Sequence, residues 1–391
     1  MTIGRIYPPE WRDYQDPLTG RRVRQLTDSP AEDYHLYFYN PSVTPDDKYL
    51  IFISERTGIS NLFRLNLQHG EIVQLTDARP VRAEYWPFTE AAKGVGSCLP
   101  AIGNHGREVF YFEGNYLLAV EIESLKQRNV LTVPADRRPS MLQANPSGDT
   151  LVFATWDETL FMERSKHAYA GEHFPDERFF QETTSTITRV EAESGSAEEV
   201  LCKEKFWINH VQVNPHNRDL ILFCHEYSEL SDRMWLLDVA TQRCEPIPGQ
   251  DTDEWYEHEF WSQDGQRVCF HGGLLADKTY GFCGWCSPDG TNYLKAYHTT
   301  SGRAYAHYNL HANGQTMITD GEARPGCISQ VYLRDGYQEF EVLCRHDSYT
   351  FGDDQRCHPH PSFTPDGSQV IFASNRTGTS NVYLTDWDGG L

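Results

Sequence analysis

The chain has 391 residues, of which 39% are hydrophobic and 13% aromatic, so it can bury a sizeable core and a disordered chain is excluded. Its formal net charge of −22 and pI near 5.1 argue against nucleic-acid and membrane partners, because an acidic surface repels phosphate groups. The amino-terminal segment lacks the apolar core of a signal peptide, and no apolar run reaches the length of a membrane span, so we expect a cytoplasmic protein.

The two ends of the chain carry the best-matched copies of an internal repeat. Residues 44–67 (TPDDKYLIFISERTGISNLFRLNL) align without gaps with residues 364–387 (TPDGSQVIFASNRTGTSNVYLTDW). Each copy predicts a tight turn followed by two strands of alternating apolar residues, joined by a short polar turn. Weaker copies begin at residues 103, 145, 214, 262 and 311. The spacings, roughly 40 to 70 residues, are typical of four-stranded propeller blades with insertions.

A second match predicts how the ring closes. The segment GEIVQLTDARP (70–80) follows the first copy and predicts the outer strand of that blade, whereas the chain ends directly after the last copy. The matching segment TGRRVRQLTDSP (19–30) stands near the amino terminus. We therefore predict an all-β fold, a seven-bladed β-propeller that forms a single domain over residues 1–391. The strand at about 19–30 would close the blade formed by about 358–391, which leaves no open sheet edge.

Four histidines share one position of the repeat, six residues ahead of the turn position that reads Asp or its substitute. They are His210, His258, His307 and His360. Equivalent positions on the innermost strands of a propeller face the same axis. One such histidine would ordinarily be a structural residue bonded to a neighbouring backbone. Packing alone favours small apolar residues at a repeated channel position, so the shared register predicts a site on the axis, in blades 4 to 7.

A second signal overlaps the first, because His358 and His360 form an H-x-H pair on a predicted strand. The period of two places both imidazoles on the same face. With His307 from the adjacent blade they offer three nitrogens, suited to zinc, manganese, iron or nickel. Gln355 would add an oxygen, whereas the Cys357 side chain should point the other way. Such a shell leaves coordination positions open, as a catalytic metal requires.

Two further residues suit chemistry on an acidic substrate. A neutral imidazole at His258 would be a general base near neutral pH. The planar fork of Arg233 suits a carboxylate, although an ordinary salt bridge is the usual role of a single arginine. His210 is open between a sugar contact and a structural role. Trp207 and Trp261 fit packing between strands better than stacking on a sugar.

These motifs resemble those of the oligogalacturonate lyase family, the polysaccharide lyases of family 22 that degrade short pectin fragments inside bacteria. The resemblance covers essentially the whole chain and is carried by YFYNPSVTPDDKYLIF, FCHEYSELSDRMWLLD, HEFWSQDG, AHYNLHANG and QRCHPHPSFTPDG. It implies a seven-bladed propeller that binds a divalent cation, most often Mn²⁺. The metal ligands implied by the resemblance are His307, Gln355, His358 and His360.

The resemblance also implies a reaction, metal-dependent β-elimination of di- or trigalacturonate with release of a 4-deoxy-5-keto-uronate. His258 would be the base that removes the C5 proton of the sugar, and Arg233 would support the reaction and bind substrate. The partner would be a small acidic oligosaccharide, with saturated or unsaturated ends; the oligomeric state is left open. One departure is the segment Tyr34-His35-Leu36, where the family carries a basic residue beside a histidine, and it bears on substrate length and linkage.

Other interpretations fit parts of the sequence. Non-enzymatic binding propellers of periplasmic assembly systems carry similar TPDG repeats, and another metal-dependent sugar-acid enzyme could use the same scaffold. A propeller peptidase would need a G-x-S-x-G motif, which the chain lacks. The pair Cys283 and Cys286 lies in a predicted strand with no second CxxC, which favours core cysteines over a zinc or redox site. Residues 160–195 are expected to form an irregular or helical insertion.

Overall fold

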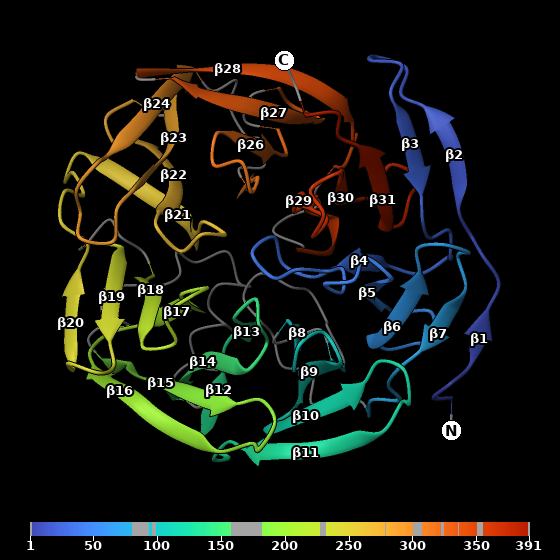
Figure 1. The fold of residues 1–391 in the computed structure, drawn as a ribbon, viewed down its shortest axis with the longest axis horizontal. Helices are drawn as coiled ribbons and strands as arrows, with labels where there is room; N and C mark the ends of the chain where they lie inside the picture. The colour runs from blue at the N-terminus through green and yellow to red at the C-terminus, as the bar shows by residue number, and fades with distance from the viewer. Residues whose placement is uncertain are drawn as a thin grey trace.

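The repeat units of the sequence form the blades of a closed seven-bladed β-propeller, seen down its axis in Figure 1. The structure, a computed structural model, describes residues 2–79, 94–95, 99–157, 182–226, 232–277, 279–299, 307–321, 324–334, 336–349 and 355–389. The predicted fold class is confirmed. Residues 160–181 of the expected insertion lie outside the described residues, whereas residues 184–191 form the blade strand β15 (Thr184–Glu191), so the expected extent of the insertion is wrong there. Within the described ranges no helix is long and apolar enough to cross a membrane.

Blades 1 to 3 follow each other along the chain. Blade 1 contains β4 (Asp33–His35), β5 (Tyr49–Ser54), β6 (Asn61–Asn66) and β7 (Ile72–Gln74), with β1 (Ile6–Tyr7) at its outer edge. Blade 2 contains β8 (Ala101–Gly103), β9 (Glu108–Glu113), β10 (Tyr116–Glu121) and β11 (Gln127–Thr132). Blade 3 contains β12 (Arg137–Pro139) and β13 (Gln143–Ala144), which both pair with β14 (Thr150–Asp157), then β15 (Thr184–Glu191) and β16 (Ala197–Glu204).

Blades 4 to 6 carry three of the four repeated histidines. Blade 4 contains β17 (Ile208–Val213), β18 (Leu220–His225), β19 (Met234–Asp238) and β20 (Arg243–Pro246). Blade 5 contains β21 (Glu254–Trp261), β22 (Val268–Leu274), β23 (Tyr280–Cys286) and β24 (Leu294–Thr299). Blade 6 contains β25 (Tyr308–Leu310), β26 (Thr316–Thr319), β27 (Cys327–Arg334) and β28 (Gly336–Arg345). A short parallel pairing of β24 with β28 joins the outer edges of blades 5 and 6 into one sheet.

Blade 7 combines both ends of the chain, as the sequence predicts. The single-turn helix η2 (Gln355–Cys357) leads to β29 (Ser362–Phe363), β30 (Gln369–Ser374) and β31 (Asn381–Asp386). The amino-terminal strands β3 (Arg22–Gln25) and β2 (Arg12–Gln15) complete the sheet, and Figure 1 shows them outside β31. The predicted closing segment therefore supplies β3, and a second amino-terminal strand, which the repeat did not predict, adds a further edge.

The hydrophobic core lies between neighbouring blades. At the junction of blades 7 and 1, for example, Leu26, Phe52 and Phe63 pack with Ile371 and Val382. Each of these side chains is at most 1% exposed, and burying one such apolar side chain stabilises the fold by roughly 1.5–3 kcal/mol. Because every blade packs against two others, closure of the ring buries the apolar faces of both terminal blades.

Candidate functional site

The structure brings the four repeated histidines together in an arc around the axis. Ring centroids are 6.0 Å apart for His210 and His258, 4.4 Å for His258 and His307, and 4.2 Å for His307 and His360. His358 joins the arc at 5.5 Å from both His307 and His360. Blades 4 to 7 thus present a continuous row of imidazoles.

A shared backbone conformation directs three of these side chains. His210, His258 and His360 have positive φ angles of 46°, 50° and 47°. In blades 4 and 5 the ladder register shifts at this point, between Asn209 and Gln212 and between Glu257 and Phe260. A β-bulge of this kind re-aims a side chain, and the left-handed conformation costs a non-glycine residue on the order of 1–3 kcal/mol. The repeat therefore preserves a strained backbone feature along with the histidine.

Three of the imidazoles are close enough to share a cation. Ligand nitrogens of His307, His358 and His360 all lie within 4.8 Å of one another. The Nε2 atom of His360 is buried and makes no hydrogen bond within the described part of the chain. A buried polar atom without a partner is costly, and a bound divalent cation would satisfy it, so these residues fit such an ion. Gln355 stands in η2 just before them, and its side chain lies outside the described atoms.

Two contacts hold these histidines in place. Asp320, fully buried, accepts hydrogen bonds from His307 through both carboxylate oxygens, at 2.7 Å from Nδ1 and 2.9 Å from the backbone nitrogen. On the other side, His35 Nε2 lies 3.0 Å from the carbonyl oxygen of Pro359, between the two histidines of the H-x-H pair. Burial lowers the pKa of His35 to about 4, so this imidazole is neutral. The departure noted at Tyr34-His35-Leu36 thus lies against the segment of the H-x-H pair. That segment is irregular, because it lies between η2 and β29, so the prediction that His358 and His360 stand on a strand is wrong.

His258 is neutral and held by a second imidazole. Its Nδ1 lies 2.7 Å from Nε2 of His271, which stands on the adjacent strand β22. Burial and the neighbouring imidazoles, His307 first among them, hold the pKa of His258 well below its usual value of 6.5. At neutral pH the ring can therefore accept a proton, as a general base must.

Arg233 is buried in a network of charges beside the arc. Its Nε donates to Glu259 at 2.8 Å, and a terminal nitrogen lies 3.5 Å from Glu226. The other oxygen of Glu259 accepts from His210 Nδ1 at 3.2 Å. Burial would raise the pKa of Glu259, but Arg233 and His210 outweigh it and lower that pKa to about 2. Arg233 thus makes the salt bridges that were the alternative to a substrate contact, although they are buried and not at the surface.

Aromatic rings from one segment lie against the arc. The ring of Tyr37 lies 4.8 Å from that of His360 and 5.8 Å from that of His210, and Phe38 lies 5.5 Å from His307. A separate cavity of about 310 Å³ is lined by residues nearer the TPDG turns, including Phe38 and Phe260. The segment is part of a motif that carries the family resemblance, but these contacts of Tyr37 and Phe38 were not predicted because it has none of the repeated histidines.

Two other predictions concern aromatic and cysteine residues. Trp207 is fully buried and packs edge-on against Trp156, and Trp261 is 8% exposed with its indole nitrogen 3.4 Å from the Gln212 carbonyl oxygen. Both positions agree with packing between strands. Cys283 and Cys286 are buried in β23, as expected of core residues.

Asp320, His271 and Glu259 were missed as candidates, although the repeat holds a signal for two of them. Asp320 follows Asn313 by seven residues, and His271 follows Asp264 by the same interval. Applying the register to the second strand as well as the first would have placed both beside a channel histidine. Glu259 stands next to His258 in HEFW, where its inward orientation depends on the bulge.

Fold and side chains together define a propeller with an axial histidine site of the kind that holds a divalent cation. The family model of oligogalacturonate lyase matches residues 1–389. The chain belongs to the oligogalacturonate lyase family, a family of carbon–oxygen lyases.

Individual relatives agree over the full length. The chain is 25% identical to an oligogalacturonate lyase of Dickeya dadantii (strain 3937) and 24% identical to an oligogalacturonide lyase of Pectobacterium atrosepticum, with 98% of each chain covered in both cases. A solved structure of an oligogalacturonate lyase in complex with manganese has a TM-score of 0.81 at 25% identity, covering 100% of this chain and 99% of that one. An oligogalacturonate lyase structure from Vibrio parahaemolyticus, 23% identical, has the same TM-score and covers 98% of both chains.

Proposed function

We propose that this protein cleaves short oligogalacturonides, such as di- and trigalacturonate, by Mn²⁺-dependent β-elimination. The observation that carries the proposal is the arc itself: a cluster of three imidazole nitrogens on one side of a neutral His258, and a buried arginine on the other. Family membership and the manganese complex of a relative support the substrate class and the cation.

Each of these residues has its own role in the proposed reaction. Arg233, which stays charged, would bind a carboxylate of the substrate. His307, His358 and His360, with Gln355, would hold Mn²⁺, which when bound supplies Lewis-acid stabilisation to the C6 carboxylate. His258 takes the proton from C5, the C4–C5 double bond forms, and the C4–O4 bond breaks with its electron pair leaving on O4. No water is consumed. Base assistance of this type contributes on the order of 10²–10⁴ in rate.

The test is turnover of trigalacturonate in the presence of Mn²⁺, followed by the ultraviolet absorbance of the unsaturated product. We expect product from the natural chain, a loss of about 10²–10⁴-fold in kcat for His258→Ala with metal content near normal, and an empty metal site in the double variant His358→Ala with His360→Ala. His216→Ala, at an exposed turn of blade 4, is the matched control and should behave like the natural chain.

Two results would contradict the proposal. Retained turnover in His258→Ala would remove the proposed base. Tight binding of trigalacturonate by the natural chain without any product would instead favour a carbohydrate-binding propeller, which is the alternative left open by the repeats.

A further inference from the structure

One position on the second strand of the blade lies beside the channel histidine. It falls seven residues after the turn position and is occupied by His271 in blade 5, Asp320 in blade 6 and Ala373 in blade 7. His271 and Asp320 each contact Nδ1 of the channel histidine of their own blade at 2.7 Å. Ala373 has no polar side chain. The side chain at this position therefore differs for each of the three neighbouring histidines.

The contact of Asp320 with His307 determines where the proton of that ring sits. An ionised carboxylate only accepts hydrogen bonds. One oxygen of Asp320 accepts from the His307 backbone nitrogen and the other faces Nδ1, so Nδ1 carries the ring proton. The remaining nitrogen, Nε2, then keeps its lone pair. Asp320 is fully buried, so this hydrogen bond is shielded from water.

We propose that Asp320 is a positioning residue that fixes His307 in the Nδ1-protonated tautomer and so keeps its Nε2 lone pair available to the cation site shared with His358 and His360. The inference rests on the proposed function, which is what calls for a cation there. This control of the tautomer is specific to blade 6. An imidazole at the same position, as in blade 5, can donate or accept, so His271 imposes no tautomer, and Ala373 of blade 7 imposes none.

The first experiment is a calorimetric titration of the full-length protein with Mn²⁺ alone. In the isosteric variant Asp320→Asn, the amide has one acceptor and cannot serve both His307 donors, so the tautomer that ligates is no longer favoured. We expect the dissociation constant for Mn²⁺ to rise by about 10–100-fold, the usual effect of removing such a partner. Glu108→Gln is the matched control, because Glu108 is a buried carboxylate of blade 2, paired with Arg128, and should leave Mn²⁺ affinity unchanged.

The second experiment reads the tautomer directly, through ¹⁵N–¹H correlations of the histidine rings in the metal-free protein, with His307→Gln used for assignment. We expect a proton on Nδ1 of His307 in the natural chain and a shift toward Nε2 in Asp320→Asn. A proton on Nε2 in the natural chain would overturn the inference, even if the variant does not fold. Unchanged Mn²⁺ affinity in a folded Asp320→Asn would overturn it too. A natural chain that binds no Mn²⁺ contradicts the proposed function instead, and the ring spectrum still tests Asp320.

Discussion

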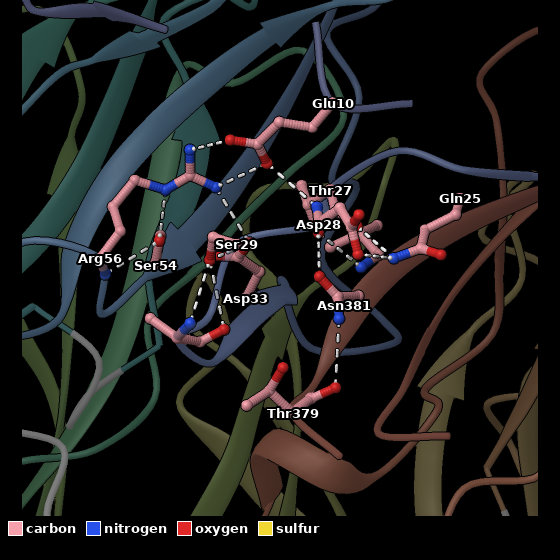
Figure 2. A network of polar contacts seen from close by, with 12 residues as sticks. Glu10, Gln25, Thr27, Asp28, Ser29, Asp33, Ser54, Arg56, Thr379 and Asn381 are labelled. Carbon is pink, nitrogen blue, oxygen red and sulfur yellow. Dashed lines mark hydrogen bonds and ion pairs between the residues drawn. The ribbon is translucent and has the colours of Figure 1, made fainter. Parts of the chain in front are cut away.

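Blades 1 and 7 are the best-matched copies of the repeat, and a comparison of the two separates scaffold from site. Asn61 and Asn381 each donate a hydrogen bond from the amide nitrogen to the threonine four residues earlier, Thr57 and Thr377 respectively. The QLTD segments are matched as well, because Gln74 bonds the Thr76 carbonyl oxygen and Gln25 bonds that of Thr27, each at 2.7 Å. Figure 2 shows part of the blade 7 arrangement, with Gln25 beside Thr27 and with Asn381 bonded to Thr27 and Thr379.

The two blades differ at the position that faces the axis. In blade 1 it is Asn40, 1% exposed, whose amide nitrogen donates to the carbonyl oxygens of Leu142 at 2.8 Å and Pro100 at 3.3 Å. In blade 7 it is His360, whose buried Nε2 has no hydrogen-bond partner in the described part of the chain. Asn40 thus uses its amide nitrogen to hold neighbouring backbone, although its Oδ1 also has no partner among the described residues. The unpartnered atom of His360 differs because it is an imidazole nitrogen, which can bind a divalent cation.

The largest expected effect comes from removing the strands that make blade 7 a copy of blade 1. Deleting residues 2–28 removes β1, β2 and β3, leaves β31 as an open edge and uncovers the packed face of blade 7. We expect no soluble folded monomer by size-exclusion chromatography and circular dichroism. A permuted chain that carries residues 1–30 after Leu391 restores the order of strands and should fold. Native-like melting of the deleted chain would refute closure by the amino terminus.

The next largest effect is a loss of stability on replacing an arginine that is equivalent in the two blades. Arg56 of blade 1, 5% exposed at its side chain, pairs with Glu10 and with the fully buried Asp33, as Figure 2 shows. Arg376 of blade 7 is 16% exposed and pairs with the more exposed Asp347. Arg56→Met leaves the fully buried carboxylate of Asp33 and the half-buried one of Glu10 without their cationic partner, so we expect a loss of about 3–5 kcal/mol in unfolding free energy. Arg376→Met should lose about 1 kcal/mol or less. Equal losses in chemical denaturation would contradict this ranking.

A smaller effect tests the axial position itself. Asn40→Ala removes two buried hydrogen bonds, and we expect a loss of up to about 3 kcal/mol with Mn²⁺ affinity retained. His360→Asn places the blade 1 residue in blade 7, where asparagine tolerates the positive φ. We expect its metal-free stability to stay within about 0.5 kcal/mol of the natural chain, while Mn²⁺ binding weakens. Denaturation and calorimetry of both variants would show whether stability and binding separate in this way.

The same residues show which parts of the fold and of the site can be predicted from the sequence. The repeat places His210, His258, His307 and His360 on one register, so both the ring and the arc of imidazoles are predictable. It does not reveal that Arg233 is held by Glu259, because that contact depends on a bulge that turns neighbouring side chains inward. The position of Tyr37 is equally hidden, since its segment lies outside the repeated unit. Contacts set by irregular backbone are what single-sequence patterns miss.

The last expected effect concerns pH and returns to blade 1. Burial, opposed in part by Arg56, raises the pKa of Asp33 from 3.8 to about 6. Between these values the folded state holds the proton more tightly than the unfolded chain does. The stability from this group is therefore complete below about pH 4 and is lost as the pH rises through 6, on the order of 3 kcal/mol. Asp33→Asn cannot titrate. The unfolding free energy of the natural chain minus that of Asp33→Asn should fall from pH 4 to pH 7, and a difference that rises over this range would mean that Asp33 is ionised throughout and held by Arg56.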